Sequence, residues 1–568
     1  MISLYTVKQF VTAPKTLFFL TFVTLLVPNV ALCLTEHLSV LASMVNVLLP
    51  LGVYWLLMTL SGKPGKMTWI LFPLIFFAAF QIVLLYLFGR GVIAVDMFLN
   101  LATTNPTEAG ELLDNLLPGV VSVFVLYLPV LILGVLSILN KKRLSSAFLR
   151  RQRRYSLVAL TLGAVLAVVC KLGNRDYKFS DQLFPANVCY NLWLAIERTG
   201  KTNGYETTAA RFRYYAHSIH TTDSAEVYVL VIGETARAEE FGIYGYRRNT
   251  TPLLAKTDGL TVFTHVLTQS NTTHKSVPML LSLATAEDYD CIYWTRGVIS
   301  AFREAGFHTT FLSNQRPNHS FIDIFGKEAD DCRFIKESLP EDSNVLDMSL
   351  LAMLKDVLKQ RHNKQLVVLH TYGSHFNYRE RYPQTDAYWK PESDASAQYS
   401  NRRQLLNAYD NTIRYTDRLL SGIIRAIADK HCTAALLYTS DHGENIFDDE
   451  RQLFLHASPV PSCHELWVPF ITWTSRAYAA KHPDMVRALH ANRTQPVQSS
   501  VSTIHTLLQM AGIATPCLQK DKSLASPDYH CGKRHYLNDH NQPLPLGKTG
   551  MTGLDFRYLH QWGVTNLD

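Results

Sequence analysis

The sequence predicts a two-part protein, with five membrane-spanning helices followed by an α/β domain that contains a largely parallel sheet. Three observations predict this class. Long apolar runs crowd the first 171 residues, and strand-like apolar runs alternate with helical periodicity from residue 226 onward. Several of those strand-like runs end in carboxylate or imidazole side chains. The first two observations set the architecture, and the third indicates where a site would lie.

The membrane part is predicted from five apolar runs, since a hydrocarbon core of roughly 30 Å takes about 20 helical residues to cross. We place the spans at residues 15–34, 38–61, 67–89, 117–139 and 155–171. The first run has no clear small-residue cleavage site and four more spans follow it, so we do not interpret it as a signal peptide. The predicted domains are a membrane domain (1–171), a bridging segment (172–225) and an exported domain (226–568).

Charge on the short loops predicts the orientation, because Lys and Arg stay on the cytoplasmic side. The loop from Lys141 to Arg154 holds seven Lys and Arg, whereas the segment 90–116 carries four acidic residues against one Arg. Five spans with the N-terminus inside then place everything after Leu172 outside the cytoplasm. The cytoplasmic loop largely explains the net charge of +7, so we expect no nucleic-acid partner.

Cysteine usage agrees with an exported domain. Seven of the nine cysteines lie after residue 172, where disulfides would persist. An odd number leaves at least one thiol unpaired, and the sequence does not give the connectivity. The candidate pairs are Cys517 with Cys531, which are close in sequence, and Cys291 with Cys332.

Ligand-type side chains close several of the predicted strands. The carboxyl ends of strands are where open α/β sheets bind ligands. A single Glu leaving a strand is most often a solvated loop residue, but carboxylates and imidazoles gathered at one sheet edge suit Zn²⁺ or Mn²⁺. The sequence therefore favours a metal site there. The residues at these strand ends are Glu234, His370, His375, Asp441, His442 and Glu444.

A candidate nucleophile lies in the segment "QSNTTHKSVPMLLS", which offers Thr272 and Thr273. Pro278 and the apolar residues after it predict a helix that begins just beyond, with its free N–H groups directed at an anion. Coordination to a divalent cation would lower the pKa of a Thr hydroxyl and make it a nucleophile at neutral pH. An ordinary Thr-rich helix cap stays open as the alternative.

Four blocks of the chain resemble a known family: "GETARAEEFGIYGYRRNTTPLLAK", "NTTHKSVPM", "GSHFNYRERYP" and "YTSDHGE". They look like the signature blocks of the membrane-bound phosphoethanolamine transferases that modify lipopolysaccharide, including the mobile colistin-resistance enzymes. That family belongs to the alkaline phosphatase/sulfatase superfamily, and the resemblance covers nearly the whole chain. It implies a sulfatase-like fold for the exported domain.

The resemblance also implies roles for individual residues. Thr273 would be the nucleophile that takes up phosphoethanolamine. The residues that would hold one tightly bound Zn²⁺ are Glu234, Thr273, Asp441 and His442. Those that would bind substrate phosphate or a second metal are His375, His456 and, with a weaker match, His464; the first two are also candidate proton donors to leaving oxygens. Those that would contact the lipid donor are Asn100, Thr104 and Glu108, whose spacing places them on one face of a helix.

The implied reaction moves phosphoethanolamine from phosphatidylethanolamine to lipid A or the lipopolysaccharide core, through a covalent phosphoethanolamine-threonine intermediate. A membrane anchor would keep the lipid donor and a lipid-linked acceptor close to the catalytic domain. The family's members with this activity include polymyxin-resistance enzymes. We expect a monomer in the bacterial inner membrane, with its catalytic domain in the periplasm.

Two departures from the family pattern leave the acceptor open. Gln269 and Met279 stand where the colistin-resistance enzymes carry a disulfide, and His319 stands at or near the place of a phosphate-contacting Lys. One alternative is a phosphoglycerol transferase of the lipoteichoic acid or glucan type. Another is a non-catalytic membrane receptor with a sulfatase-like outer domain, although the intact zinc-binding set argues against it.

Overall fold

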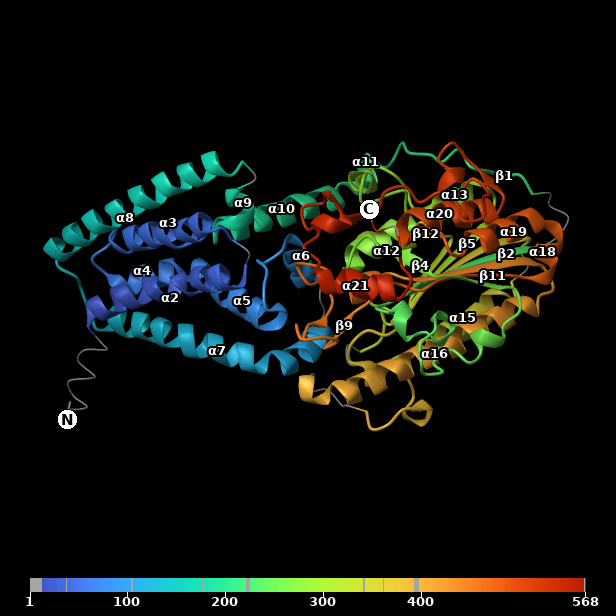
Figure 1. Cartoon of the computed structure of the whole chain (residues 1–568), viewed down its shortest axis with the longest axis horizontal. Helices are drawn as coiled ribbons and strands as arrows, with labels where there is room; N and C mark the ends of the chain where they lie inside the picture. Colours follow the sequence, from blue (N-terminus) through green and yellow to red (C-terminus); the bar gives the residue numbers. More distant parts are fainter. Residues whose placement is uncertain are drawn as a thin grey trace. The chain divides into compact units, whose positions relative to one another are not determined.

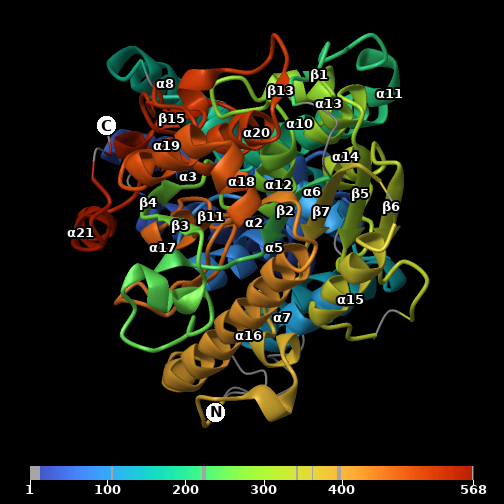
Figure 2. The same cartoon turned by 90° about the vertical axis from the view of Figure 1, so that its right-hand side faces the viewer.

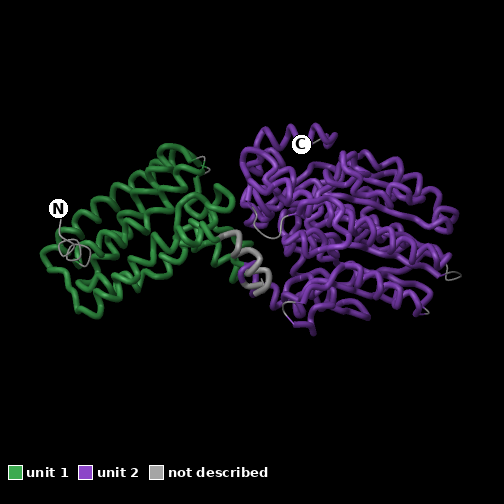
Figure 3. Tube along the Cα trace, turned by 90° about the horizontal axis from the view of Figure 1, so that it is seen from below, with its two compact units in different colours: residues 1–98, 113–197 green, residues 99–112, 198–568 purple. Residues whose placement is uncertain are grey.

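The structure is a computed structural model that describes residues 13–36, 38–103, 106–175, 177–220, 225–340, 343–360, 362–392, 398–565 and 567, without the side chains of 102–116. The chain forms two compact units (Figure 3). Unit 1 comprises residues 1–98 and 113–197, and unit 2 comprises residues 99–112 and 198–568. Each unit has a hydrophobic core of its own. The domain boundaries predicted at residues 171 and 225 stay predictions.

Unit 1 is helical, and its described residues hold four helical segments that are long and apolar enough to cross a membrane. They are α2 (Pro14–Thr35), α3 (Val40–Met58), the part of α7 (Pro106–Leu139) from Leu117 onward, and α8 (Ser146–Gly173). A fifth span exists if α4 (Pro64–Ile70) and α5 (Phe72–Phe88) count as one. The other helices are α9 (Phe179–Gln182) in unit 1, and α6 (Val95–Thr103) and α10 (Ala186–Asn203), each of which has residues in both units.

The predicted span at 67–89 is bent, because α4 and α5 meet at Leu71 with an angle of 59°. Pro73 lies in the first turn of α5. A proline has no N–H to donate and its ring clashes with the carbonyl four residues earlier, so it is tolerated at the start of a helix but not inside one. The structure therefore supports four or five spans, and the count of five is not fixed.

Two glycines allow α3 and α8 to pack closely. A Cβ atom on Gly52 would lie 2.5 Å from the backbone nitrogen of Leu160, and one on Gly163 would lie 2.7 Å from the Cα of Leu49. Small residues at such contacts let helix backbones approach within a membrane, where lipid removes the hydrophobic drive for association.

Unit 2 is built on a seven-stranded sheet in the order β3-β11-β8-β2-β7-β5-β6. Among these strands only β11 runs against the others, so the sheet is largely parallel, as predicted. The strands are β3 (Leu260–Phe263), β11 (Phe470–Thr474), β8 (Thr433–Ser440), β2 (Glu226–Gly233), β7 (Lys364–His370), β5 (His308–Ser313) and β6 (Asp331–Phe334).

Helices cover both faces of this sheet (Figures 1 and 2). On one face α12 (Thr273–Leu281), α13 (Val298–Glu304) and α20 (Ser499–Met510) pack with Leu230 and Ile232 of β2. On the other, α15 (Met348–Val357) and α16 (Arg402–Ala428) pack with Val229 and Val231. Burial on both faces is why β2 is a continuous apolar run, and it leaves the strand ends as the place for polar groups.

The remaining elements of unit 2 are short. The helices are α11 (Tyr205–Thr208), α14 (Phe321–Gly326), α17 (Cys463–Leu466), α18 (Arg476–Lys481), α19 (Pro483–Asn492) and α21 (Gly553–Gln561). The strands are β1 (His217–Ser218), β4 (His265–Leu267), β9 (Asn445–Ile446), β10 (Phe454–Leu455), β12 (Pro496–Gln498), β13 (Ile513–Ala514), β14 (His535–Leu537) and β15 (Pro543–Pro545).

All nine cysteines lie in the described residues, and all are free thiols. The candidate disulfides are therefore not formed. Cys332 lies in the edge strand β6, whereas Cys291 lies in a separate helical turn before α13. Cys517 and Cys531 line one cavity together with Cys291 but are not joined.

Candidate active site

Glu234 and Asp441 meet because β2 and β8 are parallel neighbours. Gly233 pairs with Ser440 at the end of this ladder, and the next residue on each strand is the acidic one. The Asp441 N–H donates to the carbonyl of Gly233 at 3.0 Å. Both carboxylates are buried, with 1% of Glu234 and none of Asp441 exposed. The predicted strand-end site therefore begins with two acidic groups at one sheet edge.

Backbone donors orient the Asp441 carboxylate. Thr235 adopts a positive φ of 51°, which a β-branched residue rarely does, and this turn brings its N–H to within 3.1 Å of Asp441 Oδ1. The His442 N–H donates to the same oxygen at 2.7 Å. Asp441 Oδ2 has no hydrogen-bond partner among the described residues and lies 3.2 Å from His442 Nε2. One carboxylate oxygen is thus fixed by the backbone, and the other is left for a ligand.

Thr273 lies at the N-terminus of α12 and contacts two of the strand-end residues. Its hydroxyl donates to Glu234 Oε1 at 3.0 Å and lies 3.0 Å from His442 Nε2. The prediction that the helix begins beyond Pro278 is wrong, because α12 begins at Thr273 and Pro278 lies within it. The first-turn N–H groups of Lys275 and Ser276 both donate to the Thr272 carbonyl, so these two are not available to an anion.

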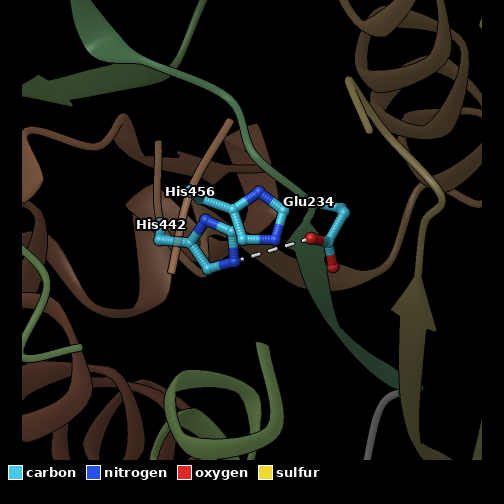
Figure 4. Close-up of side chains that lie close together, drawn as sticks. All are labelled: Glu234, His442 and His456. Carbon is cyan, nitrogen blue, oxygen red and sulfur yellow. Dashed lines mark ion pairs between the residues drawn. The ribbon is translucent and has the colours of Figure 1, made fainter. Parts of the chain in front are cut away.

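Glu234, His442 and His456 form a compact group at this edge (Figure 4). One ligand atom from each lies within 4.8 Å of the others, and His442 Nε2 is 3.6 Å from Glu234 Oε1. His442 Nδ1 donates to the Gly443 carbonyl at 2.8 Å, which leaves Nε2 to face the group. His456 Nδ1 lies 2.9 Å from Glu444 Oε2. Partners of this kind fix the ring orientation of metal-binding histidines.

The charge state of the cluster fits a bound cation. Burial raises the pKa of Glu234 well above its usual range, and the charge of Asp441 adds to this. Burial likewise raises the pKa of Asp441 to about 7. Burial lowers the pKa of His442, so this imidazole is neutral and can bind a metal. Two buried carboxyl groups, a neutral imidazole and a hydroxyl make the N/O donor set that Zn²⁺ accepts.

Two other predicted histidines, His375 and His370, lie in different places. His375 is beside the cluster, with its ring 5.8 Å from that of His456 and its Nδ1 2.6 Å from the Phe376 carbonyl. His370 is buried in the sheet, where Ser313 Oγ lies 3.1 Å from its Nδ1. The structure thus places His375 beside His456, whose ring lies 4.3 Å from that of His442, and buries His370 in the sheet.

His464 belongs to a second charged group. Its Nδ1 lies 2.6 Å from Glu239 Oε1 and 4.0 Å from Asp448 Oδ2. Arg237 lies 3.1 Å from Glu239 and 2.8 Å from Asp448, so this group already contains a buried cation. The structure does not bring His464 into the group that contains Glu234 and His442.

The candidate donor-binding residues are only partly described. Asn100 lies in α6, whereas Thr104 and the side chain of Glu108 fall outside the described residues. Their role stays a prediction.

Sequence reasoning missed two side chains that support the site. Tyr378 donates its hydroxyl to Glu444, the carboxylate beside His456. Gln315, which follows β5, donates to Glu234 Oε2 at 3.0 Å. Gln315 follows β5 as Glu234 follows β2, so its place after a strand was a usable signal. Its amide is not one of the carboxylates and imidazoles from which the metal site was predicted.

The sulfatase family model matches residues 226–513, half of the sequence. The chain belongs to the sulfatase family. Its resemblance to phosphoethanolamine transferases, predicted from four motifs, is confirmed by relatives with that name.

Two relatives come from Escherichia coli strain K12. Phosphoethanolamine transferase EptC is 27% identical over 314 residues, which are 53% of this chain and 53% of that protein. Kdo(2)-lipid A phosphoethanolamine 7''-transferase is 31% identical over 294 residues, 50% of each chain. The match therefore spans about half the length of these relatives.

Two solved structures share the fold of this sulfatase-family chain. The integral membrane lipooligosaccharide phosphoethanolamine transferase A of Neisseria meningitidis superposes with a TM-score of 0.70 at 22% identity, over 90% of this chain and 98% of that one. The periplasmic domain of Escherichia coli EptC, in complex with Zn, gives 0.56 at 24% identity, over 62% and 98%. The Neisseria meningitidis structure therefore matches both the helical N-terminal region and the sulfatase-like domain of this chain.

Proposed function

We propose that this protein transfers phosphoethanolamine from phosphatidylethanolamine to lipid A or the lipopolysaccharide core, in two steps through Thr273. The observation that carries the proposal is the position of the Thr273 hydroxyl, 3.0 Å from both Glu234 Oε1 and His442 Nε2, at a helix N-terminus. A structural threonine would not need two buried ligand-type partners. Relatives named as phosphoethanolamine transferases support the choice of transferred group.

Glu234, Thr273, Asp441 and His442 would hold one Zn²⁺, since their donor atoms converge and a bound cation would keep the two buried carboxyl groups ionised. When bound, the ion would lower the pKa of the Thr273 hydroxyl and offset charge on the phosphoryl oxygens. We propose that His375 and His456 contact the substrate phosphate or a second metal.

In the first step, Thr273 Oγ1 attacks the phosphorus of the donor, and the bond from phosphorus to the diacylglycerol oxygen breaks. A phosphoryl group bound near Thr273 would also lie at the N-terminus of α12, where the positive end of the helix dipole favours an anion. We propose that His375 or His456 takes the proton that the Thr273 hydroxyl loses and gives it to the diacylglycerol oxygen. In the second step an acceptor oxygen attacks the same phosphorus, the bond to Thr273 breaks, and the acceptor proton would pass through one of these imidazoles to Thr273 Oγ1.

This chemistry belongs at a membrane surface. The apolar helices of unit 1 would anchor the chain in the bacterial inner membrane with unit 2 in the periplasm, in agreement with the Lys and Arg bias of the segment 141–154, which includes the start of α8. A donor and an acceptor that are both membrane lipids would then meet the site at high effective concentration.

The experiment that tests the proposal gives the purified full-length protein one phospholipid at a time. With phosphatidylethanolamine, intact mass should increase by one phosphoethanolamine group, and diacylglycerol should be released. With phosphatidylglycerol, no adduct should form. An adduct only from phosphatidylglycerol would make the protein a phosphoglycerol transferase, and no adduct from any donor together with no bound zinc would favour a receptor.

A further inference from the structure

Gln315 connects three neighbouring strand ends beside the site. It lies two residues after β5, and its side-chain Nε2 donates to Glu234 Oε2 and to the Thr371 carbonyl, both at 3.0 Å. Glu234 follows β2 and Thr371 follows β7. Because the sheet order is β2-β7-β5, one amide group reaches from the third strand across the second to the first. Both hydrogens of the amide are used.

The two oxygens of the Glu234 carboxylate face different partners. Oε1 accepts the Thr273 hydroxyl at 3.0 Å and lies 3.6 Å from His442 Nε2, so it faces the cluster. Oε2 accepts the Gln315 amide. A carboxylate can rotate about its last side-chain bond, and a donor held on one oxygen prevents that rotation. Gln315 does so without adding a charge that would repel a metal ion.

Gln315 is itself held in place from below. Its backbone N–H donates to Ser313 Oγ at 3.1 Å, and that hydroxyl lies 3.1 Å from Nδ1 of the fully buried His370. On the other side, the Thr371 N–H donates to the Ile232 carbonyl at 3.0 Å, which ties the second acceptor to β2. This network also gives a use to His370, a buried strand-end imidazole that the mechanism leaves out.

We propose that Gln315 is a positioning residue for the metal centre: it directs Glu234 Oε1 to the ion and holds Oε2 away, so that this carboxylate binds through one oxygen. The proposal rests on the proposed metal centre. Residues that hydrogen-bond to metal ligands typically change metal affinity by 10–100-fold when they are lost.

The test compares two glutamine variants of the purified full-length protein. Gln315→Met keeps the length of the side chain and removes both donors. Gln365→Met is the matched control, because the amide of Gln365 likewise donates to two acceptors, the backbone carbonyls of Gln360 at 3.4 Å and His362 at 3.3 Å. Gln365 lies near the start of β7, at the opposite end of the strand from Thr371 and the site. Both variants lose a side-chain amide, but only the amide of Gln315 donates to Glu234.

Zinc affinity would be measured by competition with a chelator, and the number of N/O ligands by zinc X-ray absorption. We expect Gln315→Met to bind zinc about 10–100-fold more weakly and to gain one oxygen ligand as Oε2 turns to the ion. Gln365→Met should match the wild type in both. A Gln315→Asn variant, which keeps the donors on a shorter arm, should fall between the two and serves if Gln315→Met does not fold.

Three results would overturn the inference. Unchanged affinity and ligand number in Gln315→Met and Gln315→Asn would show that Gln315 does not position the metal ligand, while the proposed function would stand. An equal loss in Gln365→Met would mean that lost stability explains the effect. A wild-type protein that binds no zinc would remove the proposed metal centre and this inference together.

Discussion

Replacing Thr273 by alanine removes a hydroxyl that lies 3.0 Å from both Glu234 Oε1 and His442 Nε2, and the structure separates its effect on stability from its effect on chemistry. The hydroxyl donates one hydrogen bond at 3.0 Å to a buried carboxylate. Leaving such a group without its donor costs about 1–3 kcal/mol of folding free energy. Losing a covalent nucleophile costs about four to six orders of magnitude in rate, or about 5–8 kcal/mol in activation free energy. The chemical effect should therefore be much the larger.

The assay is intact-mass measurement after incubation with phosphatidylethanolamine, combined with thermal unfolding and zinc content. Thr273→Ala should fold, keep Glu234, Asp441 and His442 as possible zinc ligands, and form no adduct. Thr273→Ser keeps the hydroxyl and should retain part of the rate. Thr272→Ala is the matched control, because the Thr272 hydroxyl contacts only Ser270 Oγ, at 3.1 Å, among the hydrogen bonds of the described residues.

The reasoning would be refuted by either of two patterns. An adduct that persists in Thr273→Ala and vanishes in Thr272→Ala would mean that the neighbouring threonine is the nucleophile. An adduct that persists in both variants would exclude a covalent intermediate on this segment.

Three further predictions concern topology, the lipid donor and pH. A reporter that is active only outside the cytoplasm should be active after Asn174 and silent after Ser146, and the reverse pattern would place the site in the cytoplasm. Glu108→Ala should slow transfer from a membrane donor at normal zinc content, whereas full activity would make this residue part of a solvated face. Burial raises the pKa of Glu328 from 4.5 to about 7, so its contribution to stability is full below pH 4.5 and is lost as pH rises through 7. Glu328→Gln should thus match the wild type in free energy of unfolding at pH 4.5 and exceed it at pH 8 by about 1 kcal/mol or more. An equal difference at both pH values would contradict this.

Local sequence determined the framework of the site. The apolar run of β2 ends at Gly233 and that of β8 at Ser440, so the places of Glu234 and Asp441 could be predicted from strand patterns alone. The expectation that both meet at one edge needed only the rule that buried parallel strands point the same way. The long apolar runs predicted the membrane helices in the same manner, because burial in lipid depends on composition more than on partners.

Tertiary structure decided what depends on contacts between distant segments. The start of α12 at Thr273 overrides the local preference of Pro278 for a first turn, since α12 is packed into the core beside α20. Gln315 and Glu234 are 81 residues apart, and their hydrogen bond exists only because the strand order is β2-β7-β5. His464, which the family resemblance matched to a residue for substrate phosphate or a second metal, lies with Arg237, Glu239 and Asp448 and not with Glu234 and His442. Residue type and spacing along the chain fix which groups can bind a metal, whereas the packing of the strands and helices fixes which of them meet.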